Sequence, residues 1–81
     1  MNLTKEEYKR LFKKNIDLTH THLLNVLKDP SILEQIPEGA HVILIPLDDE
    51  WQIKKNMELA EENVKKGEVV LLMPMKHCQS P

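Results

Sequence analysis

Two short apolar runs of similar composition, separated by one helix-like segment, constrain the fold of this chain more than any other feature. They cover residues 42–47 (VILIPL) and 69–75 (VVLLMPM). Both are apolar at successive positions and rich in branched residues, which is typical of strands covered on both faces. Two such strands joined by a crossover helix form a parallel, right-handed βαβ unit. The sequence therefore predicts an α/β fold with a two-stranded parallel sheet.

Helical patterns account for most of the remaining chain. A long N-terminal helix is expected over residues 5–28, where Thr4 and Glu7 have the spacing of a capping box. A short connecting helix is expected over 31–36, and the crossover helix over about 50–66. We expect the long N-terminal helix to lie on the sheet face opposite the crossover helix, because both faces of the strands are apolar.

Each predicted strand contains a proline near its end, Pro46 in the first and Pro74 in the second. Proline donates no hydrogen bond to a ladder, so both residues should lie at strand ends or face an unpaired edge. An added strand would then have to pair with the stretches before the prolines, residues 41–45 and 68–73.

The length of the chain predicts a marginal core. We expect a single domain over residues 1–81, with an ordered core over about 4–75 and a frayed tail over 76–81. A chain of 9.5 kDa buries only about 63% of its unfolded surface, and the only cysteine, Cys78, precludes an internal disulfide. Two strands also leave two open edges. The sequence therefore predicts a homo-oligomer, a dimer or larger, that completes the sheet.

Charge and composition exclude several classes of partner. The 11 basic and 13 acidic residues give a net charge of −2, which provides no bulk attraction to nucleic acid or to an anionic membrane. No apolar run approaches the ~20 residues of a membrane span, and a lone cysteine suits a reducing compartment. We therefore expect a cytoplasmic protein with neither a nucleic-acid nor a membrane partner.

The four histidines do not form a recognisable metal motif. His20 and His22 project about 160° apart on a helix, and His41 and His77 have no ligand at zinc-site spacing. Soft ligands for copper would come from Cys78 and two methionines, but Met73 and Met75 are needed as apolar residues of a strand. The sequence predicts no metal site and no cofactor.

The first helix is expected to carry one broad apolar stripe, made of Tyr8, Leu11, Phe12, Ile16, Leu23, Val26 and Leu27. A polar line interrupts this stripe at Asn15, Thr19 and His22. Polar groups in such a stripe cost free energy unless they are paired, and they often fix register or oligomeric state. Three interpretations remain open: a wet margin of the helix, a self-pairing interface, or a small pocket in which His22 carries a proton.

An acidic segment, Asp48 to Glu50, follows the first predicted strand and opens the crossover helix. Ligands of open α/β sheets bind at this end of the strands. Three carboxylates repel phosphate, however, and capping of the helix explains Asp48 or Asp49 without any ligand. Trp51 stands beside them as a solitary aromatic contact point. Asp48, Asp49, Trp51 and His22 are the candidate binding residues.

Several short motifs together resemble a family of small prokaryotic proteins described only as a domain of unknown function. These motifs are Asp29-Pro30, LEQIPEGA at 33–40, PLDD at 46–49, and Asn56 with Leu59-Ala60. The resemblance implies a small cytosolic α/β protein. It carries no activity and no site residues to this chain.

No nucleophile stands beside a sequence-evident base, so no catalytic residue is assigned. The sequence favours a non-catalytic, homo-oligomeric interaction or regulatory module, which acts on itself or on a protein partner. The alternative is a small-molecule-binding protein or enzyme whose pocket forms at a subunit interface, from His22 and the Asp48–Trp51 segment.

Overall fold

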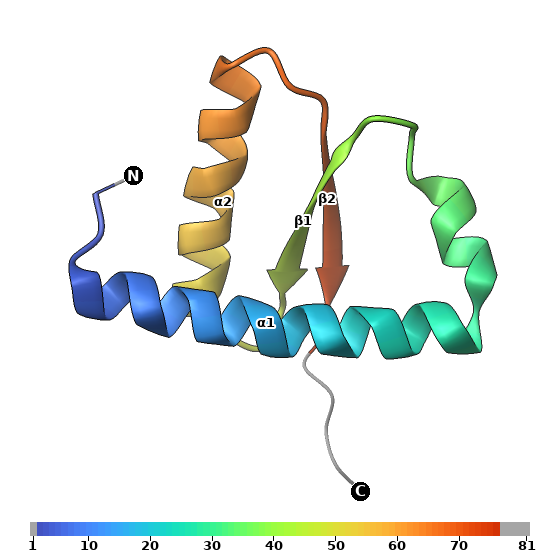
Figure 1. The fold of residues 1–81 in the computed structure, drawn as a ribbon, viewed down its shortest axis with the longest axis horizontal. Helices are drawn as coiled ribbons and strands as arrows, with labels where there is room; N and C mark the ends of the chain where they lie inside the picture. Colours follow the sequence, from blue (N-terminus) through green and yellow to red (C-terminus); the bar gives the residue numbers. More distant parts are fainter. Residues whose placement is uncertain (1, 77–81) are drawn as a thin grey trace, which may run out of the picture.

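The structure is a computed structural model that describes residues 2–76, and it has the α/β architecture expected from the sequence (Figure 1). The tail expected over residues 76–81 lies, apart from Lys76, outside the described residues. In chain order the elements are α1 (Lys5–Lys28), the 3₁₀ helix η1 (Pro30–Gln35), β1 (His41–Pro46), α2 (Glu50–Lys65) and β2 (Val70–Met75).

The two strands and α2 form the predicted βαβ unit. β1 and β2 are parallel and in register from His41 opposite Val70 to Pro46 opposite Met75. α2 covers one face of this sheet (Figure 1). The core between them is built on three buried residues, Ile43, Ile45 and Ala60, around which Ile53, Met57, Leu59 and Val70 pack.

The prolines lie on the open edges of the sheet, as the sequence predicts. The carbonyl of Val69 accepts a hydrogen bond from the amide of His41 at 2.8 Å, and the carbonyl of Met75 accepts one from the amide of Leu47, which follows β1, also at 2.8 Å. Backbone groups alternate between the two sides of a strand in a parallel ladder, so those of Val70, Leu72 and Pro74 point to the free edge. The missing N–H of Pro74 therefore removes no bond between the strands. The same alternation places the missing N–H of Pro46 on the free edge of β1.

The helix ends follow local sequence signals. At the start of α1, the Glu7 amide donates to Thr4 Oγ1 at 3.1 Å and the Thr4 amide donates to Glu7 Oε1 at 3.2 Å, which is the predicted capping box. Asp29 ends this helix and begins η1 by accepting from the Ser31 amide at 3.2 Å. Gly67 follows α2 with a φ of +83°, a left-handed conformation that glycine adopts at little cost.

The position of α1 differs from the prediction. It crosses the carboxyl-terminal ends of both strands and does not lie flat on the sheet face opposite α2 (Figure 1). Its buried residues are Leu11, Leu18 and Thr21. Hydrogen bonds explain this position. Lys14 and Asn15 of α1 bond to Asp49 and Gln52 at the start of α2, and α2 begins at this end of the sheet. Apolar patterning alone did not predict that these contacts decide where α1 lies.

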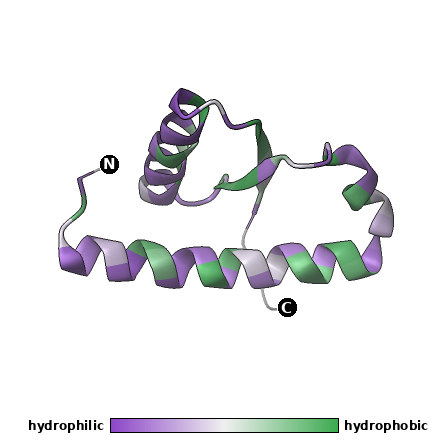
Figure 2. Cartoon of the chain, turned by 45° about the horizontal axis from the view of Figure 1, so that its top comes forward, coloured by the Kyte–Doolittle hydropathy of each residue, from purple (hydrophilic) through white to green (hydrophobic). Residues whose placement is uncertain are grey.

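The folded chain is thin and has a small interior. Its principal extents are 36 × 35 × 16 Å, so it is shallow in one direction. Within residues 2–76, the buried apolar residues are Leu11, Leu18, Ile43, Ile45, Pro46 and Ala60. Eleven large apolar side chains are exposed in the same part of the chain, and six of them belong to α1. Figure 2 shows hydrophobic bands alternating with hydrophilic ones along this helix. The structure therefore has the small core that the length predicts.

Candidate functional site: a buried amide cluster and an apolar helix stripe

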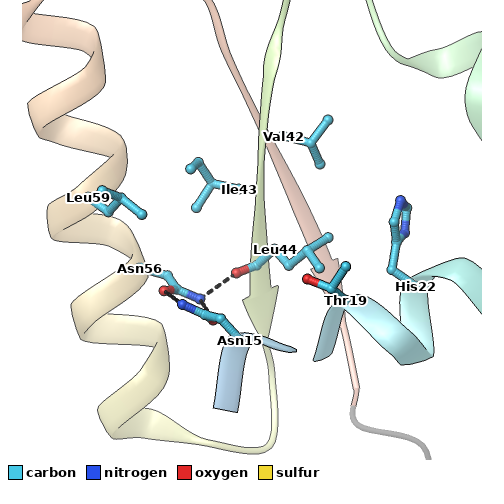
Figure 3. Close-up of a pocket in the computed structure, with 8 residues that line it drawn as sticks. All are labelled: Asn15, Thr19, His22, Val42, Ile43, Leu44, Asn56 and Leu59. Carbon is cyan, nitrogen blue, oxygen red and sulfur yellow. Dashed lines mark hydrogen bonds between the residues drawn. The ribbon is translucent and has the colours of Figure 1, made fainter. Parts of the chain in front are cut away.

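Three side-chain amides, Asn15 of α1 with Gln52 and Asn56 of α2, form what we call the amide cluster. Asn15 and Asn56 bond reciprocally, Asn15 Nδ2 to Asn56 Oδ1 at 3.0 Å and Asn56 Nδ2 to Asn15 Oδ1 at 2.9 Å (Figure 3). Gln52 Nε2 donates to the same Asn15 oxygen at 2.8 Å. Gln52 is fully buried and Asn56 is 2% exposed. Buried amides are costly unless paired, so these bonds hold α1 against α2. Among the described residues, Gln52 Oε1 is the one oxygen of the cluster without a hydrogen-bond partner.

The amide cluster also occupies one edge of the sheet. Asn56 Nδ2 donates to the carbonyl of Leu44 at 2.9 Å (Figure 3), and by the alternation of the ladder this carbonyl points to the free edge of β1. An incoming strand would have to displace Asn56 from its acceptor. Of the two edges that the sequence predicts to be open, that of β1 is therefore partly filled by the chain itself.

The acidic segment before α2 contributes to the same attachment. Asp49 is the N-cap of α2: its Oδ1 accepts from the Gln52 amide at 3.0 Å, and its Oδ2 accepts from Lys14 Nζ of α1. Trp51 is half-buried beneath the Arg10 guanidinium, which lies 4.1 Å from the ring centroid. Asp48 is exposed. Of the two aspartates that the sequence left open as the cap, the structure selects Asp49.

A cavity of about 310 Å³ lies between α1, α2 and β1 (Figure 3). All three residues of the polar line predicted on α1 line this cavity, namely Asn15, Thr19 and His22. The remaining lining residues are Val42, Ile43, Leu44, Asn56 and Leu59. Neither Asp48, Asp49 nor Trp51 reaches this cavity, so the structure does not bring His22 to the acidic segment.

The chemistry of this cavity is limited. Among residues 2–76, His22 is the only titratable side chain in the lining of the cavity, and no carboxylate of this part of the chain lines it. The amide of Asn15 is already bonded within the amide cluster. Thr19 and His22 supply a hydroxyl and an imidazole next to an apolar wall. Such a lining suits the binding of a small, mostly apolar molecule better than acid–base catalysis, which needs a second group positioned at the reacting atom.

The histidines do not converge. In residues 2–76, no group of three or more His, Cys, Asp and Glu side chains has the geometry to hold a metal ion. His41 Nε2 lies 3.6 Å from a carboxylate oxygen of Glu68. Met73 and Met75 are half-buried residues of β2, while His77 and Cys78 lie outside the described residues. The absence of a bound metal stays a prediction.

α1 also carries a set of exposed apolar side chains, which the helical pattern of the sequence did not distinguish from the residues that face the core. We define the α1 stripe as Tyr8, Phe12, Ile16, Leu23 and Leu27. These side chains are 62%, 59%, 52%, 55% and 78% exposed, and the rings of Tyr8 and Phe12 stack with centroids 6.4 Å apart. The sequence placed them on one broad apolar stripe together with Leu11 and Val26. The breadth of this stripe could have indicated a second apolar surface, because packing against one neighbour covers only part of the circumference of a helix.

Comparison with known proteins gives a family but no function. The model of a family of unknown function, DUF5647, matches residues 10–80. The chain belongs to this family. Membership confirms the resemblance noted from the motifs, since the match extends from α1 to beyond β2. No curated protein and no solved structure matches the chain. Among the described residues of this family member, no helix combines the length and apolarity needed to cross a membrane.

Proposed function

We propose that this protein is a non-catalytic, homo-oligomeric interaction module of the cytoplasm. The observation that carries the proposal is the α1 stripe, five large apolar side chains that are each more than half exposed on one helix. Monomeric proteins rarely expose contiguous apolar patches beyond a few hundred Å², and larger patches mark interaction sites. The lone cysteine is in keeping with a reducing compartment.

The small interior supports the same proposal. Six buried apolar residues in the described chain give a core that is marginal by the standards of a domain of this size. Association that buries the α1 stripe would add apolar burial that folding of one chain does not provide. A regulatory role toward another protein would use the same surface, or the free edge of β2.

The second candidate function is the binding of a small molecule in the cavity beside the amide cluster. Its specific support is the volume of about 310 Å³, which lies at the lower end of the range of ligand pockets. Thr19 and His22 are the lining groups available to orient such a ligand, because neither makes a side-chain hydrogen bond in the described structure. No feature of the cavity indicates a reaction.

Sedimentation velocity and light scattering on the full chain test the proposal. We expect a species of at least twice the chain mass of 9.5 kDa at micromolar concentration. A compact monomer throughout that range would contradict the proposal. A thermal-shift screen with a panel of neutral metabolites tests the second candidate, since a ligand that binds the native state raises apparent stability by mass action. Stabilisation that Thr19→Val and His22→Phe both abolish would favour the pocket.

A further inference from the structure

The α1 stripe is spaced symmetrically about the middle of the helix. Ile16 lies three residues before Thr19, and Leu23 lies three residues after His20. Phe12 and Leu27 then stand four residues further out on either side. Reversing the direction of the helix therefore superimposes Phe12 on Leu27 and Ile16 on Leu23, while Tyr8 has no counterpart within α1.

We propose that α1 pairs with α1 of a second copy, antiparallel, about a two-fold axis that passes between Thr19 and His20. This inference rests on the proposed function and names its partner and its surface. Ile16 lies opposite the partner's Leu23, and Phe12 lies opposite the partner's Leu27. A two-fold interface uses one patch on both subunits and must be self-complementary. The spacing of the stripe satisfies that condition.

The surface of α1 has the relief that such a pair requires. A groove of about 460 Å³ runs along the stripe, lined by Phe12, Asn15, Ile16, Thr19, His20 and Leu23. The small side chain of Thr19 lies at its centre, with large apolar side chains on both sides. Helices that interdigitate approach to 8–10 Å between axes, depending on the side chains at the contact. The two copies of Thr19 meet at the axis, where a large residue would hold the helices apart.

The size of the stripe fits a second copy. Large apolar side chains present about 200 Å² each when fully exposed, so the four paired side chains, each more than half exposed, offer about 500 Å² per copy. The two copies together then bury about 1,000 Å² before Tyr8 or any polar flank is counted, which is about the size that a specific interface should clear.

Electrostatics favour the antiparallel direction over the parallel one. In a parallel pair, Lys9 and Lys13 would each lie beside their own counterpart near the stripe, and the two helix dipoles would be aligned side by side. In the antiparallel pair, the amino-terminal half of one helix lies beside the carboxyl-terminal half of the other. Opposite ends of the two dipoles are then adjacent, and the lysines of the two copies are separated.

Disulfide trapping tests this geometry in a Cys78→Ser background. Thr19→Cys lies next to its own counterpart at the axis, so mild oxidation with diamide should yield a covalent dimer. Phe12→Cys lies about 22 Å along the helix from its counterpart and should not cross-link to itself. A mixture of Phe12→Cys and Leu27→Cys should form a heterodimeric cross-link. The single Phe12→Cys variant is thus the matched control for the reactivity of an exposed cysteine.

The outcomes separate this inference from the proposed function. Self-linking of Phe12→Cys would show a parallel pair and would overturn the antiparallel geometry. A stable dimer that links at none of these positions would overturn this inference and leave homo-oligomerisation intact, whereas a monomeric protein would overturn both.

A charge substitution gives an independent readout. Ile16→Glu should convert the dimer to a folded monomer, with unchanged helix content by circular dichroism. Leu24→Glu is the matched control, since Leu24 is an exposed apolar residue of α1 outside the stripe. Equal dissociation by both variants, or by neither, would contradict the proposal.

Discussion

The two faces of α1 differ in a way that is the reverse of an ordinary surface helix. The face toward α2 and β1 carries Lys14, Asn15 and His22 beside a few buried apolar residues, whereas the face toward solvent carries the α1 stripe. A helix of a monomer normally turns its apolar side to the core. Here the inner face is fastened by hydrogen bonds and the outer face retains most of the apolar surface. This difference is what the proposed pairing of α1 with a second copy would explain.

The largest effect on the inner face is expected from Asn56→Ala. This change removes the reciprocal pair with Asn15 and the bond to the Leu44 carbonyl, and it leaves buried groups without partners. We expect a loss of about 3 kcal/mol in the free energy of unfolding, measured by urea titration at one protein concentration. Asn63→Ala on the same helix is the matched control, with an expected change within about 0.5 kcal/mol. Equal losses in both variants would mean that the amide cluster does not hold α1.

Asp49→Ala should have the next largest effect. Asp49 caps α2 through the Gln52 amide and accepts from Lys14, so its removal should cost about 0.5–2 kcal/mol of unfolding free energy. Asp48→Ala is the comparison, because both aspartates precede the helix but Asp49 is the cap. A greater loss for Asp48→Ala than for Asp49→Ala in the same urea titration would contradict this assignment.

Arg10→Ala tests a weaker attachment on the inner side of α1. The guanidinium lies over the ring of Trp51 at 4.1 Å, an interaction worth about 0.5–1 kcal/mol at a partly exposed site. The change should also raise the accessibility of Trp51, seen as a red shift of its fluorescence. Lys9→Ala provides the control for loss of a neighbouring cation. An unshifted Trp51 spectrum in Arg10→Ala would exclude this contact in solution.

The smallest effect concerns the pH dependence of the α1 cap. The pKa of Glu7 is lowered below its ordinary value of 4.5, first by the hydrogen bond from the Thr4 amide and then by that from the Thr4 side chain. A carboxyl group with a lowered pKa stabilises the folded state above its unfolded pKa, and this contribution is lost as the pH falls through the folded pKa. Glu7→Gln should therefore flatten the acid limb of the plot of unfolding free energy against pH. A Glu7→Gln profile that superimposes on the parent profile would contradict the capping role.

The features predicted from the sequence are those set by neighbouring residues. Thr4 and Glu7 are three residues apart, and the prolines lie within their own strands, so local chemistry was enough for each. The amide cluster was missed because Asn15 and Asn56 are 41 residues apart. Their pairing depends on how α1 crosses the sheet, and no spacing in the sequence encodes that crossing.

The residues of the candidate site were predicted from local spacing, but their roles were not. Helical periodicity grouped Asn15, Thr19 and His22 correctly, and all three line one cavity. It did not separate their roles: the amide of Asn15 is bonded inside the chain, whereas Thr19 lies at the centre of the exposed groove. Gln52 and Asn56 lie about one turn apart on α2, beside the core-packing residues Ile53 and Met57. This polar pair was the one signal in the sequence that could have revealed the amide cluster.

The most direct test of the central claim, that the outer face of α1 is an interface between two copies, is an isotope-filtered nuclear Overhauser experiment. Labelled and unlabelled protein are mixed, refolded together and observed for contacts that cross between chains. We expect intermolecular contacts between the methyl groups of Ile16 and Leu23, together with contacts from the Phe12 ring to the Leu27 methyls. Intermolecular contacts confined to the free edge of β2, for example at Leu72, or the absence of any such contact in a folded protein, would contradict it.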